Sequence, residues 1–250
     1  MPLQYWNRKF VGKFLHGYQI NDFYSKFQLK GLVYSNSKRF KTAITELQTQ
    51  CLRLKTVIIK TIRLPLFLMT GLLLEFKNIK IIHLVRDPRS TLLSQKKVFH
   101  KNNLTSMSEH HIVSSHCMQV SNDVTTFDVL SQYYPDKLKR VFYEKLVSNL
   151  LSTTKMLYSY LDLTFSDNIV KVLEKMNSKG NQNNYFVTER INSLQLAFIW
   201  RLKVTMDFVQ DVDKHCRCSY QRLGYRPVTS ERILRNISIP FYSDDTSLET

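Results

Sequence analysis

The segment KIIHLVRDPRSTLLSQ, residues 80–95, combines an apolar run with cationic and hydroxyl side chains. Its β-branched residues between 81 and 85 predict a buried strand, and Pro88 suits the first turn of a following helix. A helix N-terminus offers unpaired N–H groups and the positive end of the helix dipole. Arg86 adds a planar guanidinium suited to phosphate oxygens, and Ser94 adds a hydroxyl donor. The segment therefore predicts an anion site of the phosphate-binding kind.

Asp87, between the arginine and the proline, favours a role at the helix start or in orienting an arginine rather than in catalysis. A purely structural interpretation also stands, in which Arg86 and Asp87 form a salt-bridged helix cap without a ligand. The residues alone leave both interpretations open.

The composition limits the class of protein. The chain has 250 residues, of which 43% are hydrophobic and 12% aromatic, so it can bury a core and fits one large α/β domain. Its formal net charge of +16 favours anionic partners, although it also serves general solubility. The basic residues are dispersed and no nucleic-acid-binding signature is present, so we expect no dedicated nucleic-acid partner.

Hydrophobic patterning places an α/β arrangement around the anion site. A strand at 56–60, a helix at 64–76, a strand at 80–85 and a helix from 88 to about 98 imply a parallel sheet. The later expected elements are a helix at about 111–133, a strand within 139–146 that leads into a helix, and a long helix at about 203–223 ending at Gly224. Residues 1–50 give the least clear pattern, although Phe10, Phe14 and Tyr18 recur at a spacing that suits one helix face packing on a core, and the tail from about 229 has no clear core pattern.

The four cysteines, at 51, 117, 216 and 218, are too few for a disulfide scaffold, and their pairing cannot be deduced. The sequence HCRC at 215–218 raises the possibility of a metal. Residues two apart on a helix point in different directions, so buried thiols or a disulfide are favoured and we expect no metal site.

No membrane anchor is expected in this chain. The basic N-terminal segment lacks the uninterrupted apolar stretch of a signal peptide. The most apolar window, 56–74, is interrupted by Lys60, Arg63 and Pro65 and is too short to span a bilayer.

Four blocks in one order resemble the Golgi carbohydrate sulfotransferases, which place sulfate on the 6-hydroxyl of N-acetylglucosamine, galactose or N-acetylgalactosamine. IHLVRDPRSTLLSQ (82–95) is similar to the family's motif for the 3′-phosphate of the donor, 3′-phosphoadenosine-5′-phosphosulfate (PAPS). The other three are VIIKTIRLPL (57–66), VFYEKL (141–146), in which Lys145 replaces an acidic residue, and the Trp-Arg helix with its Leu-Gly-Tyr ending (199–228).

The resemblance implies a P-loop-like sulfotransferase α/β fold, with a parallel sheet flanked by helices and incomplete at the N-terminus. The sulfotransferase domain would span residues 51–228. It would follow a segment at 1–50 whose structure the sequence does not clearly predict, and a C-terminal tail at 229–250 would come after it. Arg86 and Ser94 would bind the 3′-phosphate of PAPS, and the acceptor would be a glycan or glycosaminoglycan. Residence in the Golgi follows from the same resemblance.

One element of the family pattern is not found. The family has a 5′-phosphosulfate loop of the form Arg-Ser-Gly/Ser-Ser-Phe/Thr after its first strand, and SNSKRFKT (35–42) lacks the preceding strand and the turn glycine. We therefore expect that the N-terminal part is missing. The alternative is a catalytically inactive protein of the same fold that binds a 3′-phosphoadenosine nucleotide or an anionic glycan.

The general base of the reaction is not identified by the sequence. His16, His83 and Glu144 are candidates by residue type only. Two interpretations stand for Lys60 and Arg63. They face the PAPS donor or the sugar acceptor, or they are buried cations at a strand end with structural partners.

Overall fold

The computed structural model describes residues 45, 46, 49, 53–62, 64–101, 108–178 and 197–243. The chain divides into two compact units, Met1–Ile62 and Arg63–Thr250, and each is considered by itself. In the first unit, residues 54–62 have irregular backbone and exposed side chains. The prediction of a buried strand at 56–60 is therefore wrong, since Ile58 is 76% exposed and no described strand pairs with this stretch.

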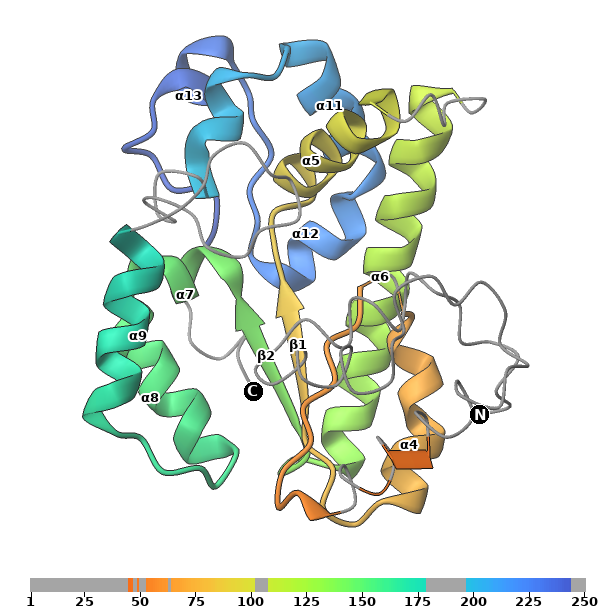
Figure 1. Ribbon diagram of the computed structural model, residues 1–250. Helices are drawn as coiled ribbons and strands as arrows, with labels where there is room; N and C mark the ends of the chain where they lie inside the picture. The colour runs from red at the N-terminus through yellow and green to blue at the C-terminus, as the bar shows by residue number, and fades with distance from the viewer. Residues whose placement is uncertain are drawn as a thin grey trace, which may run out of the picture. The chain divides into compact units, whose positions relative to one another are not determined.

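The second unit is a small parallel sheet surrounded by helices (Figure 1), which confirms the predicted α/β class. Its described elements are η2 (Leu66–Met69), α4 (Thr70–Glu75), β1 (Ile81–Val85), α5 (Pro88–Lys101), α6 (Glu109–Tyr133), β2 (Leu138–Phe142), α7 (Tyr143–Ser148), α8 (Leu150–Tyr160), α9 (Asp167–Ser178), η3 (Ile199–Leu202), α11 (Met206–His215), α12 (Arg217–Leu223) and α13 (Glu231–Arg235). The predicted helix at 64–76 is divided into a 3-10 turn and α4, and the helices at 88–98 and 111–133 are confirmed.

β1 and β2 lie side by side in parallel, with Ile81 opposite Leu138 and Val85 opposite Phe142. Alternate residues of a strand face opposite sides of the sheet, so one side of β1 carries His83 and Val85. This side packs on α6, where the His83 ring lies 5.5 Å from the ring of Phe127. Residues 82 and 84 face the other way and are exposed in the described part of the chain.

The long helix predicted at 203–223 is interrupted. Residues 203–205 are not helical, and the rest forms α11 and α12, which are separated at Cys216, whose ψ of 6° is not helical. The apolar spacing continues through the break because α11 and α12 both pack on α6, so periodicity alone could not reveal it. Gly224 ends α12 with φ 73°, in the left-handed region predicted for a C-cap glycine.

A disulfide joins Cys117 of α6 to Cys216 at the break between α11 and α12. Both cysteines are buried in the same apolar cluster as Val85 and Leu92. Cys218 is a free, exposed thiol. The sequence favoured a disulfide or buried thiols over a metal at HCRC, and Cys216 is in a disulfide.

Two features were not predicted. Asn149, with φ −128° and ψ 50°, separates α7 from α8 where one helix was expected. In the tail, Leu234 of α13 and Phe241 are buried in a cluster with Trp200. This segment has few apolar residues at regular spacing, so its place in the core depends on tertiary contacts that no local pattern encodes.

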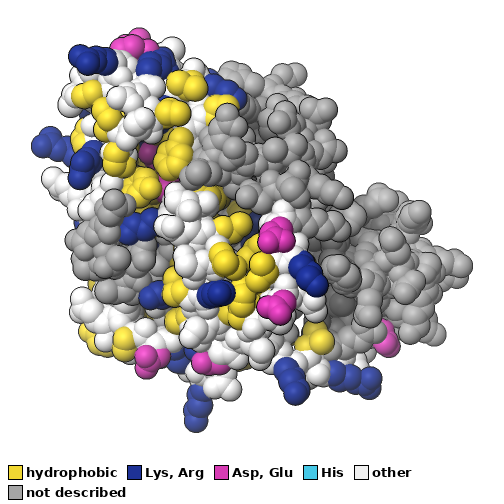
Figure 2. Space-filling view, turned by 90° about the vertical axis from the view of Figure 1, so that its left-hand side faces the viewer, with side chains coloured by type: hydrophobic (Ala, Val, Ile, Leu, Met, Phe, Trp, Pro, Cys, Tyr) yellow, Lys and Arg dark blue, Asp and Glu magenta, His cyan; other side chains and the backbone are white. Residues whose placement is uncertain are grey.

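Basic side chains are dispersed on the one face that Figure 2 shows. On this face, which carries α8 and α9, the coloured lysine and arginine side chains are spread rather than forming one band. Among the described helices, none has the length and apolar character needed to cross a bilayer.

Candidate functional site

The site is built where the two parallel strands end. Since Val85 lies opposite Phe142, the next residues, Arg86 and Tyr143, leave the same edge of the sheet together. The Arg86 guanidinium lies over the Tyr143 ring, with its central carbon 4.5 Å from the ring centroid. Arg86 is half-buried, and its Nε is buried and has no hydrogen-bond partner among the residues that the structure describes. Buried donors are nearly always paired in native proteins, so this nitrogen retains an unused capacity to donate.

Asp87 caps the helix that follows. Its Oδ1 accepts hydrogen bonds of 2.9 Å from the main-chain N–H and from Nε of Arg89, and its Oδ2 accepts one of 2.8 Å from Nη2 of Arg89. The predicted role of Asp87 at the helix start and in orienting an arginine is confirmed. The alternative salt bridge between Arg86 and Asp87 is wrong, because the partner of Asp87 is Arg89, the second residue of α5.

Arg89 is completely buried at the base of the site. Its Nη1 donates to Oδ1 of Asp213 at 3.2 Å and to the main-chain oxygen of Arg226 at 3.1 Å. Burial lowers the pKa of this guanidinium, but Asp87, Tyr220 and Asp213 together outweigh burial, and the pKa is raised above its usual range. Three aromatic rings enclose its central carbon at 5.0–5.1 Å, those of Trp200, Tyr220 and Phe241.

Glu144 joins the ends of both strands to the C-terminal segment. Its Oε1 accepts a 2.9 Å hydrogen bond from the N–H of Asp87, and its Oε2 accepts one of 3.0 Å from the hydroxyl of Tyr225. Burial, and next the negative charge of Asp87, raise the pKa of this carboxyl to about 7. Glu144 thus fixes the turn that carries Arg86, and both of its oxygens are occupied by protein donors.

The raised pKa of Glu144 predicts a pH-dependent stability. Between its ordinary pKa of 4.5 and the folded value of about 7, the folded state binds more protons than the unfolded state. The free energy of unfolding should therefore fall as pH rises through this window, by up to about 3 kcal/mol. Glu144→Gln keeps an acceptor for Asp87 and removes the titration. Urea unfolding across the window should give a sloping difference between parent and variant, and a constant difference would contradict the assignment.

The other predicted site residues are placed as follows. Ser94 lies on α5 and is exposed, and no hydrogen bond joins it to Arg86. His83 lies in the middle of β1 on the side that faces α6, where burial and the nearby Arg140 lower its pKa to about 4. His83 is therefore not at the strand ends with Arg86. Lys60 belongs to the exposed stretch of the first unit, and His16 and Arg63 lie outside the described residues.

Sequence reasoning did not identify Arg89 or Tyr225 as parts of this arrangement. Arg89 stood within the quoted motif, but its partner Asp213 is 124 residues away. Arg201, in the Trp-Arg block, is likewise structural. Its guanidinium donates to the main-chain oxygens of four residues, Ile233, Leu234, Asn236 and Ile239.

Comparison with known proteins places this architecture in a family. Residues 18–167 match the model of a family described as "Sulfotransferase family". The chain is similar to carbohydrate sulfotransferase 1 of Danio rerio, at 29% identity over 213 residues that make up 78% of this chain and 50% of the relative. The human carbohydrate sulfotransferase 1 is 27% identical over 205 residues, 76% of this chain and 49% of its own.

Mouse carbohydrate sulfotransferase 4 is 25% identical over 184 residues, 66% of this chain and 47% of its own. The chain spans about half the length of these relatives. Because the family model covers more than half of the chain, the protein belongs to the sulfotransferase family.

Proposed function

We propose that Arg86 and Ser94 bind the 3′-phosphate of PAPS, and that the chain acts as a carbohydrate sulfotransferase. The observation that carries the proposal is the Nε of Arg86, with which no described residue pairs and which is held over Tyr143 where both strands end. A phosphate oxygen would satisfy this donor and add charge-assisted hydrogen bonds to the guanidinium. The exposed hydroxyl of Ser94 would donate from the second turn of α5, the helix that follows Arg86.

The proposed reaction transfers a sulfuryl group to a sugar 6-hydroxyl. The hydroxyl oxygen forms a bond to sulfur as its proton passes to a base, and the bond from sulfur to the bridging oxygen of PAPS breaks. The products are the 6-sulfated sugar and 3′-phosphoadenosine-5′-phosphate. Positioning and electrostatic stabilisation would dominate catalysis, as in phosphoryl transfer. Glu144 is not proposed as the base, because both of its oxygens accept hydrogen bonds within the protein.

The proposed acceptor is a glycan or glycosaminoglycan carrying N-acetylglucosamine, galactose or N-acetylgalactosamine. The proposed compartment is the Golgi lumen, and the disulfide between Cys117 and Cys216 supports it, because such bonds persist in oxidising compartments. The net charge of +16 is also suited to an anionic donor and an anionic polymer.

Arg86→Ala should strongly reduce stabilisation by the nucleotide. A saturating excess of 3′-phosphoadenosine-5′-phosphate, about 100 times its Kd, should raise the Tm of the parent protein by roughly 5–10 °C. The same ligand concentration should shift Arg86→Ala by about half of this or less, because losing one charge-assisted contact of about 1.5–3 kcal/mol weakens binding about ten- to a hundred-fold. Arg217→Ala, which removes an exposed arginine of α12, is the matched control and should respond like the parent. A full shift in Arg86→Ala would contradict the assignment.

A transfer assay separates the enzyme from a binding protein of the same fold. That second candidate is favoured by one observation, that SNSKRFKT lacks the features of the family's 5′-phosphosulfate loop. Labelled sulfate from PAPS should appear on a keratan- or chondroitin-type acceptor and not on its 6-deoxy analogue. A nucleotide-dependent rise in Tm without any transfer would favour the binding protein.

A further inference from the structure

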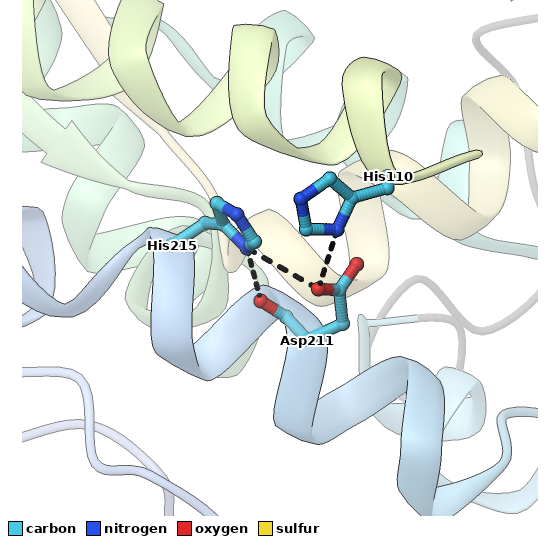
Figure 3. A group of neighbouring side chains, drawn as sticks. All are labelled: His110, Asp211 and His215. Carbon is cyan, nitrogen blue, oxygen red and sulfur yellow. Dashed lines mark hydrogen bonds and ion pairs between the residues drawn. The ribbon is translucent and has the colours of Figure 1, made fainter. Parts of the chain in front are cut away.

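Three side chains that could ligate a metal meet outside the phosphate site. Figure 3 shows His110, from the first turn of α6, facing Asp211 and His215 of α11. The Nδ1 atoms of His110 and His215 lie 3.2 and 3.3 Å from the same oxygen, Oδ1 of Asp211. One ligand atom from each residue lies within 4.8 Å of the others, and the two imidazole rings meet edge to face at 4.5 Å.

The helix spacing and the disulfide explain why these residues meet. Asp211 and His215 are four residues apart, so they share one face of α11. His110 is seven residues, two turns, before Cys117 and therefore lies on the side of α6 that faces α11. Because Cys117 is bonded to Cys216, the residue after His215, the disulfide holds the two histidine-bearing helices against each other. The disulfide thus helps to fix the positions of the three side chains relative to one another.

We propose that His110, Asp211 and His215 form a binding site for a divalent transition-metal ion of the zinc class. Two imidazoles and one carboxylate are a ligand set that suits zinc, and they leave a fourth position for water. Calcium and magnesium prefer oxygen ligands throughout and should bind weakly here. The sequence predicted no metal from Cys216 and Cys218. The three ligands here come from segments about 100 residues apart, and Cys216 is in a disulfide.

Two of the three ligand spacings fit a tetrahedral ion, and all three lie within 4.8 Å. Bonds of about 2.0–2.1 Å hold neighbouring ligand atoms of such an ion about 3.3 Å apart. The two distances from nitrogen to Oδ1, 3.2 and 3.3 Å, agree with that separation. The ion would replace the 3.2 Å contact between His110 Nδ1 and Asp211 Oδ1, and also the 2.8 Å hydrogen bond between His215 Nδ1 and the main-chain oxygen of Asp211. The His110 side chain is 65% exposed, so an ion can reach the site from solvent.

The consequence is a second cross-link beside the disulfide. The ion would join the first turn of α6 to the last turn of α11, so it should stabilise the second unit without contacting Arg86. Stabilisation by zinc therefore does not depend on the proposed transferase activity, and either can fail without the other.

The test is a calorimetric titration of the full chain, first freed of metal with a chelator, with zinc chloride and separately with magnesium chloride. We expect one zinc ion to bind with micromolar affinity, a rise in Tm of roughly 5 °C at saturating zinc, and no magnesium binding. His110→Ala should weaken zinc binding about 100-fold, by analogy with the loss of metal-site partners. His111→Ala is the matched control, because His111 is the exposed neighbour on α6 outside the cluster.

Two further variants keep the test decisive. Asp211→Asn should weaken binding as His110→Ala does, because it removes the carboxylate that both histidines approach. Cys218→Ser should bind as the parent does. The proposal is overturned if zinc does not bind, if His110→Ala and His111→Ala bind zinc equally, or if Cys218→Ser alone abolishes binding. The last result would assign the ion to the exposed thiol.

Discussion

Arg89→Met is expected to lower the free energy of unfolding by about 3–5 kcal/mol, because it leaves a buried ion-pair network without its cation. Asp87 and Asp213 would lose their shared partner while remaining buried, and three aromatic rings would lose the guanidinium that they enclose. Arg89→Lys should recover little of the loss, since an ammonium group cannot reproduce the planar fork that contacts both carboxylates. Urea unfolding measures both variants.

An exposed arginine provides the control for Arg89. Arg222 of α12 donates to the hydroxyl of Thr125 at 2.6 Å and pairs with Asp128, but its side chain is 41% exposed. Arg222→Met should therefore cost less than about 1 kcal/mol. If Arg89→Met were no more destabilising than Arg222→Met, the ion pairs of Arg89 with Asp87 and Asp213 would not stabilise the fold around the site.

The second large effect concerns the disulfide. Cys117 and Cys216 are 99 residues apart, and closing a loop of about 100 residues restricts the unfolded chain by an amount equivalent to about 4.7 kcal/mol. The double replacement Cys117→Ala and Cys216→Ala should lower the free energy of unfolding by about 2–5 kcal/mol. Unfolding in urea with and without a reductant makes the measurement.

Adding a reductant provides an internal control for the contribution of the disulfide. The parent protein should lose stability when reduced, whereas the double variant should not respond. Cys218→Ser should behave like the parent in both conditions, because Cys218 is free and exposed. A double variant as stable as the oxidised parent would show that the bond contributes nothing to the fold.

The sequence correctly predicted elements that are determined by residues close together in the chain. The run at 81–85 and Pro88 predicted a strand entering a helix, and the structure has β1 followed by α5 at that place. Gly224 predicted the end of a helix because a left-handed residue favours glycine. The stretch at 56–60 was equally apolar, but a strand also requires a hydrogen-bonded neighbour, and no described strand pairs with it.

The supporting contacts of the site could not be predicted, because they join distant segments. Glu144 contacts Asp87 across 57 residues, and Tyr225 contacts Glu144 across 81. Arg86 and Arg89 are both arginines of one short motif, and their sequence context does not say which is buried. Only the fold separates them: Arg89 is enclosed by carboxylates and rings, whereas Arg86 has a nitrogen that pairs with none of the described residues.

The central claim is that Arg86 recognises the 3′-phosphate of an adenosine nucleotide. The most direct measurement is calorimetric titration of the parent protein and of Arg86→Ala with 3′-phosphoadenosine-5′-phosphate and with adenosine 5′-monophosphate. The parent should prefer the 3′-phosphorylated ligand by about ten- to a hundred-fold, as expected for loss of one charge-assisted contact. Arg86→Ala should lose this preference and bind adenosine 5′-monophosphate as the parent does. Equal binding of both nucleotides by the parent, or an undiminished preference in Arg86→Ala, would contradict the claim.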